Sequence, residues 1–254
     1  MKKLLWTLRT TKTGRLIRTA ALALCALALV PLSGCLYPDD QTPGNRASAR
    51  EAVQTVQDAV DRYQQATGVL PMMNADESTP RYEKFKLDFA KMKRMGYVST
   101  LPKLAFENGG SNQFLIVDEE TKPTVKLLDI PIYQGVGEVQ AKVTAYAQKN
   151  GGALPADEEV YPGFKYVDFK KLAMREPKLR SMYSGRALSL IVDDKGRVYA
   201  DYGIDLTQAI EKSGATPGAD EDLRERLADE SYYVPVKSPV YRWVDGSVRA
   251  VAES

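Results

Sequence analysis

Residues 56–71 read VQDAVDRYQQATGVLP, and residues 139–155 read VQAKVTAYAQKNGGALP. Both stretches begin with Val-Gln, place a Tyr seven residues after that Val, and end in Gly-x-Leu-Pro. Apolar side chains three or four positions apart predict an amphipathic helix in each stretch, and the glycine predicts where the helix ends. We therefore expect a helix followed by a tight corner twice in this chain.

Two further pairs of segments match in the same order along the chain: residues 85–92 (FKLDFAKM) with 164–172 (FKYVDFKKL), and residues 114–118 (FLIVD) with 189–193 (SLIVD). Ordered matches of this kind predict an internal repeat of one structural unit. Each unit is expected to contain a helix, a corner, a short helix and a β-hairpin, with the short helices around residues 86–95 and 166–175.

A third, shortened copy is predicted near the C-terminus. Residues 210–217 (IEKSGATP) resemble the corner, residues 222–227 (DLRERL) resemble the short helix, and residues 241–246 (YRWVDG) resemble the hairpin. The Asp-Gly pair in the last segment is typical of a two-residue hairpin turn. Coincidence among common turn residues remains an alternative explanation for this copy.

The pattern predicts an α+β fold with antiparallel sheet. A lone hairpin is barely stable, so the units should share strands or pack on one another's helices. The alternation of strand and helix that is typical of a parallel sheet does not occur. The expected organisation is a lipoprotein signal peptide over 1–34, a flexible tether over 35–47, and repeat units over 48–131, 132–206 and 207–254.

The N-terminus has the features of an export signal. Residues 1–18 are basic and hold no acidic side chain, and an apolar run follows over residues 20–32. The next segment fits the lipobox of bacterial lipoproteins, Leu32, Ser33, Gly34 and Cys35. That resemblance implies cleavage before the cysteine and acyl chains such as palmitate on its sulfur and amine. An ordinary secretory peptide cleaved near the same glycine is the alternative.

Lipidation would place the protein on a membrane surface outside the cytoplasm, because two or more acyl chains anchor a protein stably. The whole chain has 35 basic and 33 acidic residues. The first 34 residues hold six of the basic ones and no acid, so the remainder has a net charge of −4. An acidic body argues against nucleic acid as a partner, because its phosphates require basic surfaces.

Composition also limits the chemistry. The chain has no histidine, which excludes Ser-His-Asp and Cys-His catalysis and histidine-ligated metals. One of its two cysteines lies in the leader and the other is the lipidation position, so no disulfide is expected. Acidic clusters such as Asp118-Glu119-Glu120 and Asp157-Glu158-Glu159 lack the spacing of a calcium loop and fit solvated turns or helix starts. We expect no catalytic residue, cofactor site or metal site.

Tyrosines are numerous, and those that recur at equivalent positions, such as Tyr63 and Tyr146, favour core packing. Three aromatic residues lie outside the clear repeat, near the last hairpin. We predict these as exposed contacts for a partner: Tyr232, Tyr233 and Trp243.

Two resemblances cover parts of the chain. The Tyr-x-x-x-x-Gly-x-x-Pro pattern at residues 63–71 looks like the start of the globular part of type II secretion pseudopilins. The AVDRYQQATGVLP segment at 59–71 and the Glu-Asn-Gly-Gly turn at 107–110 resemble the Bacillus-type lipoprotein family YphF. The second resemblance implies a lipoprotein on the outer face of a Gram-positive plasma membrane, and members are sometimes labelled transporter substrate-binding proteins.

The leading hypothesis is a membrane-anchored, non-enzymatic binding or assembly module for a protein or a cell-wall polymer. One alternative is a pilin-like structural subunit or a secretion accessory. Others are a transporter-associated substrate-binding lipoprotein and a wall-active enzyme that uses carboxylates. A transporter's solute-binding protein requires two lobes of parallel α/β sheet, which the pattern here does not predict.

Overall fold

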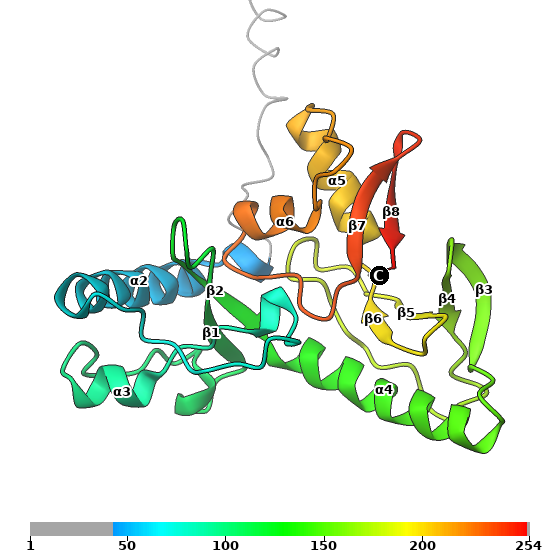
Figure 1. The fold of residues 1–254 in the computed structure, drawn as a ribbon, viewed down its shortest axis with the longest axis horizontal. Coiled ribbons are helices and arrows are strands. Elements are labelled where there is room, and N and C mark those ends of the chain that lie inside the picture. The colour runs from blue at the N-terminus through cyan, green and yellow to red at the C-terminus, as the bar shows by residue number, and fades with distance from the viewer. Residues whose placement is uncertain (1–42, 253–254) are drawn as a thin grey trace, which may run out of the picture. The chain divides into compact units, whose positions relative to one another are not determined.

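The computed structural model describes residues 43–252, and within them the fold is α+β, as predicted (Figure 1). The predicted signal peptide, the lipobox residues Leu32, Ser33 and Gly34, and Cys35 lie outside the described residues. The described helices are α2 Ala47–Thr67, α3 Phe89–Arg94, α4 Ile130–Lys149, α5 Gly203–Ser213 and α6 Arg224–Glu230, with 3-10 helices η3 Pro43–Asn45, η4 Arg81–Glu83 and η5 Phe106–Asn108. The strands are β1 Asn112–Val117, β2 Thr124–Asp129, β3 Ala156–Tyr161, β4 Phe164–Val167, β5 Leu190–Asp193, β6 Val198–Ala200, β7 Val240–Val244 and β8 Ser247–Val251.

Antiparallel pairing joins the strands within each sheet. The sheets are β1-β2, β3-β4-β5-β6 and β7-β8. None of the helices in the described range is long and apolar enough to cross a membrane.

The first unit packs α2 against the β1–β2 hairpin. Buried apolar side chains follow one face of α2, as the sequence periodicity predicts. The helix ends at Gly68, whose φ of 74° lies in the left-handed region and whose N–H donates to the Gln64 carbonyl at 2.8 Å. A short extended segment then pairs with β1, with the Leu87 N–H donating to the Phe114 carbonyl at 3.0 Å.

The second unit begins with α4 directly after β2, and α4 packs on β6. The prediction of a short helix around residues 166–175 is wrong. Strand β4 occupies the start of that range, and the Asp168 carboxylate then accepts from the Lys170 and Lys171 N–H groups. This turn ends at Ala173, whose φ of 50° cannot continue a right-handed helix.

Strand β3 was not predicted as a strand. It carries the acidic cluster Asp157-Glu158-Glu159, which is exposed at the edge of the four-stranded sheet. Charged side chains on an edge strand discourage pairing with another chain. The cluster therefore lies in a solvated strand and not in a turn or at a helix start.

The third unit contains α5, α6 and the β7–β8 hairpin. The Asp-Gly turn at the tip forms as predicted, with positive φ at both Asp245 (49°) and Gly246 (75°). The Leu223 N–H donates to the Tyr241 carbonyl at 3.1 Å, so the residue that precedes α6 is hydrogen-bonded to β7.

The helices that open the second and third units begin earlier than the predicted unit boundaries. Helix α4 begins at Ile130 and α5 at Gly203, two and four residues before the predicted starts of the second and third units. The end of the predicted tether, residues 43–47, is folded, because η3 lies there and the Gly44 N–H donates to the Met182 carbonyl at 2.7 Å. A Cβ at this glycine would lie 2.6 Å from the same carbonyl oxygen, so the close approach requires glycine.

An irregular linking segment, residues 231–238, joins all three units. Its backbone pairs with β2, where the Leu127 N–H donates to Tyr232 at 2.8 Å and the Val234 N–H donates to Leu127 at 3.0 Å. Farther along, the Lys237 carbonyl accepts from the Ala200 N–H of β6 at 2.8 Å. The segment therefore holds the first and second units beside the third.

Gln57 and Gln140 make similar contacts between a helix and a hairpin strand. Gln57 on α2 accepts from the Val125 N–H at 2.7 Å and donates to the Pro123 carbonyl at 3.1 Å. Gln140 on α4 accepts from the Val198 N–H at 2.7 Å and donates to the Gly196 carbonyl at 2.8 Å. Each amide satisfies a donor and an acceptor at the start of the second hairpin strand, where the ladder leaves them unpaired.

We predict that Gln57→Ala or Gln140→Ala lowers the free energy of unfolding by about 1–3 kcal/mol, because each leaves a buried N–H without an acceptor. Urea unfolding of the full chain, followed by circular dichroism, measures the change. Gln54→Ala on the exposed face of α2 is the control and should change stability by less than about 0.5 kcal/mol. Equal effects at all three positions would contradict a specific role for the helix-to-hairpin contacts.

The Asp129 carboxyl caps α4 by accepting from the Ile132 N–H at 2.8 Å. Burial raises its pKa, although that hydrogen bond lowers it. The folded state therefore binds more protons than the unfolded state between the two pKa values, and stability falls as pH rises through that window.

We predict that Asp129→Asn, which keeps the capping oxygen and removes the charge, makes the protein more stable at pH 7. The gain should shrink as the pH falls toward about 4, where the unfolded carboxyl is itself protonated. Thermal unfolding at both pH values measures this. Asp88→Asn, at the less buried cap of α3, is the matched control. A gain that persists unchanged at low pH would argue against the buried charge as its cause.

Candidate functional site

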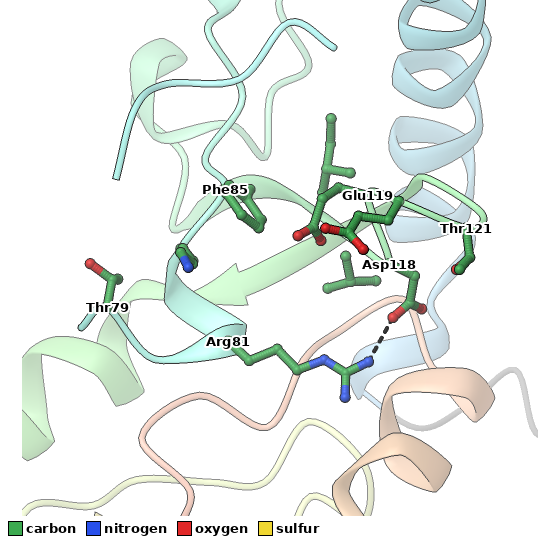
Figure 2. Close-up of a pocket in the computed structure, with 10 residues that line it drawn as sticks. Thr79, Arg81, Phe85, Asp118, Glu119 and Thr121 are labelled. Carbon is green, nitrogen blue, oxygen red and sulfur yellow. Dashed lines mark hydrogen bonds and ion pairs between the residues drawn. The ribbon is translucent and has the colours of Figure 1, made fainter. Parts of the chain in front are cut away.

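A surface groove lies where the β1–β2 turn, the η4 turn and α6 come together. One part of it, with a volume of about 500 Å³, is shown in Figure 2. A second hollow of about 250 Å³ shares Arg81, Val117 and Asp118 with the first and continues to α6. We call this surface the charged groove and define it by its ionisable side chains: Arg81, Lys84, Asp118, Glu119, Glu120, Glu225 and Asp229.

Arg81 stands at the centre of the charged groove. Its guanidinium contacts the Asp118 carboxylate at 2.6 Å, as Figure 2 shows, and the Glu225 carboxylate at 2.5 Å. Burial lowers the pKa of Arg81, but the contacts with the Glu225 and Asp118 carboxylates raise that pKa by a larger amount. The guanidinium therefore stays charged. One side chain thus links the hairpin of the first unit to a helix of the third.

Carboxylates outnumber cations in the charged groove by five to two. Asp118 has a φ of 53°, and its carbonyl accepts from the Thr121 and Lys122 N–H groups, which fixes the turn that carries Glu119 and Glu120. The Arg81 ion pairs are about two-fifths exposed, and exposed pairs contribute little to stability. A cationic ligand could therefore exchange with Arg81 at low cost.

Behind the charged groove, buried contacts hold α6 in place. The Lys126 ammonium donates to the Ala228 carbonyl and, at 2.7 Å, to the Ser231 carbonyl, which complements the negative end of the helix. Burial lowers the pKa of Lys126, and the nearby Asp229 opposes that effect. The Tyr82 ring packs between the guanidinium groups of Arg81 and Arg224, each 5.5 Å from its centroid. The groove walls are therefore well supported.

The three aromatic residues predicted as exposed contacts are all buried or partly buried. Tyr233 is only 4% exposed, so the prediction of exposure is wrong for this residue. The cause is the pairing of the linking segment with β2, and burial raises the pKa of Tyr233 to about 12. Tyr232 is partly buried against the core of the first unit, and Trp243 is partly buried against the other core cluster.

Sequence reasoning did not find the charged groove, because its residues come from three separate segments. By itself, the Asp118-Glu119-Glu120 cluster predicts only a solvated turn or a helix start. Only the long-range contact with Arg81 and α6 shows that this turn forms one wall of a groove. Across residues 43–252, no group of three or more Cys, Asp or Glu side chains is arranged to hold a metal ion.

Comparison with known proteins gives one finding. Residues 49–129 match the model of the YphF family N-terminal domain. This range begins within α2 and ends with β2, so it coincides with the first unit. The match supports a YphF-like protein, in agreement with the resemblance of the 59–71 segment. No curated protein and no solved structure matches the chain.

Proposed function

We propose that this YphF-like protein is a lipid-anchored binding module on the outer face of a bacterial plasma membrane. It has no catalytic role and holds a basic segment of a partner protein in the charged groove. The observation that carries this proposal is the excess of carboxylates around the exposed Arg81 ion pairs. Lysine and arginine side chains of a partner would find more complementary charge there than an anionic wall polymer would.

The proposed anchor fits the acidic body of the protein. A body with a net charge of −4 gains nothing from anionic lipid headgroups, so an anchor of acyl chains on Cys35 would supply the attachment that its charge does not.

We further propose that the three units are copies of one ancestral unit. Support comes from the Gln57 and Gln140 contacts, which are the same in the first two units. The corners also agree, because the Asp88 and Asp168 N–H groups donate to the preceding corner prolines at 2.9 and 2.8 Å. The bond from Leu223 to Tyr241 in the third unit parallels the bond from Leu87 to Phe114 in the first.

A pilin-like structural subunit is the second candidate. The observation in its favour is that α2 and α4 each pack against a hairpin strand of their own unit. A helix packed on antiparallel sheet agrees with the pseudopilin-like segment at residues 63–71. In that case the proteins would assemble with copies of themselves, whereas the leading proposal requires a different protein as the partner.

The proposed anchor predicts that Cys35→Ala releases the protein from the membrane. Mass spectrometry of the N-terminal peptide should find a mature chain that starts at Cys35 and carries two or more acyl chains. Cys25→Ala, within the predicted leader, is the matched control and should leave processing intact. An unmodified Cys35 thiol in membrane-bound protein would contradict lipid anchoring.

The proposed groove predicts binding of a lysine-rich decapeptide. The double variant Glu119→Lys/Glu120→Lys should weaken binding at least about tenfold, because it replaces attraction by repulsion. Fluorescence anisotropy with the full chain at two salt concentrations measures the affinity, which should fall with added salt.

The control for net charge is a double variant on exposed α4 and α2 positions, Glu138→Lys/Asp58→Lys. It changes the net charge equally but should leave the affinity within about twofold of the wild type. An equal loss in both double variants would show that the peptide responds to overall charge and not to the groove. Sedimentation of the full chain into large self-assemblies would favour the pilin-like candidate instead.

A further inference from the structure

A cavity of about 410 Å³ lies between the β3–β4 hairpin, the loop at residues 184–189 and the first turns of α5. It shares no lining residue with the charged groove. Its volume is within the range of sites for small organic ligands. Two carboxyl groups, Asp201 and Asp205, lie in its wall and differ in how they are hydrogen-bonded.

Asp201 is held in a fixed position. Its Oδ1 atom accepts from the Tyr241 hydroxyl at 2.6 Å, the Tyr161 hydroxyl at 3.0 Å and the Gly203 N–H at 2.9 Å. A Cβ at Gly203 would lie 2.1 Å from the Tyr161 oxygen, so only glycine allows the phenol to approach this closely. The Asp201 carboxylate and the Tyr161 ring therefore form a rigid wall of the cavity, and the buried Tyr241 hydroxyl holds that carboxylate from behind.

Asp205 is left with an unmet hydrogen-bond requirement. The residue is only 5% exposed, and within the described residues its buried Oδ1 atom has no hydrogen-bond donor. Burial raises the pKa of Asp205, while the hydroxyl groups of Ser184 and Ser181 lower it. A buried acceptor without a donor is costly, and a ligand that donates to it recovers that cost.

The charge of the lining indicates what kind of donor fits. Three residues with carboxyl groups, Asp201, Asp205 and Glu211, line the cavity together with one cationic residue, Arg186. The rings of Tyr161 and Tyr166 also line the cavity, and aromatic faces attract cations. An ammonium group has three donors and no acceptor, which matches a wall of acceptors.

We propose that this cavity binds a small aliphatic primary amine, whose ammonium group donates to the Asp205 carboxylate beside the Asp201–Tyr161–Tyr241 cluster. The aliphatic part of the ligand packs on the tyrosine rings, and Glu211 at the exposed side adds attraction for the cation. This is a second binding activity, and it does not depend on the peptide-binding role of the charged groove.

Isothermal titration calorimetry of the full chain with 1,4-diaminobutane tests the proposal. We expect saturable binding at one site, and no binding of butane-1,4-diol, which has the same length without the charges. Asp205→Asn keeps the side-chain shape and should weaken diamine binding at least tenfold. Glu211→Gln, on the exposed surface of α5, should weaken it a few-fold and does not threaten folding. Asp245→Asn, in the exposed β7–β8 turn, is the control and should bind as the wild type does.

Several results would overturn the proposal. These are the failure of diaminobutane to saturate a single site, equal affinity for the diol, and equal weakening by Asp245→Asn and Asp205→Asn. Binding of a chitin disaccharide in preference to the diamine would also overturn it, because it would identify the cavity as a site for neutral sugars. If Asp205→Asn does not fold by circular dichroism, an undiminished affinity in Glu211→Gln and Asp201→Asn overturns the proposal.

Discussion

The hydrogen bonds of the linking segment, residues 231–238, are the contacts on which the rest of the structure depends. Strand β2 pairs with β1 on one edge and with this segment on the other. The Tyr202 hydroxyl of the second unit donates to the Val236 carbonyl at 3.1 Å, and the Tyr183 hydroxyl donates to Tyr233 at 3.1 Å. The linking segment thus provides hydrogen-bond acceptors to the first and second units, which share no sheet with each other.

Charge reinforces this arrangement. The Lys237 ammonium contacts the Glu83 carboxylate of the first unit at 2.9 Å and lies 4.4 Å from the centroid of the Tyr133 ring of the second. Glu83 is buried, so this pair is better shielded from water than the exposed Arg81 pairs. The Lys237 pair and the two Arg81 pairs therefore differ in their surroundings. The Lys237 pair is shielded at the junction of the units, and the Arg81 pairs lie open at the surface.

The elements that the sequence predicted well are those that local chemistry determines. Helix α2 follows from its apolar stripe and from Gly68, and the β7–β8 turn follows from Asp245-Gly246. The prediction of a short helix around 166–175 is wrong because Asp168 can either cap a helix or close a turn. The pairing of β4 with β5 favours the turn. The prediction that Tyr233 is exposed is wrong for a similar reason, because its burial depends on pairing with a strand more than a hundred residues earlier in the chain.

Neither the charged groove nor the cavity beside α5 could be predicted by the same route. The charged groove requires Arg81 to meet Glu225, and the cavity requires Tyr161, Asp201 and Tyr241 to converge, so each depends on contacts between units.

Both surfaces also use the third unit, which is the shortest and the least similar of the three. If the units are copies, the first two have kept the glutamine contacts that build a helix and hairpin. On that view the third would have lost this contact, and its Glu225 and Tyr241 side chains contact Arg81 and Asp201 of the neighbouring units. Divergence of one copy at the junctions is the change that would add binding surfaces to a repeated scaffold without disturbing the packing within each of the other units.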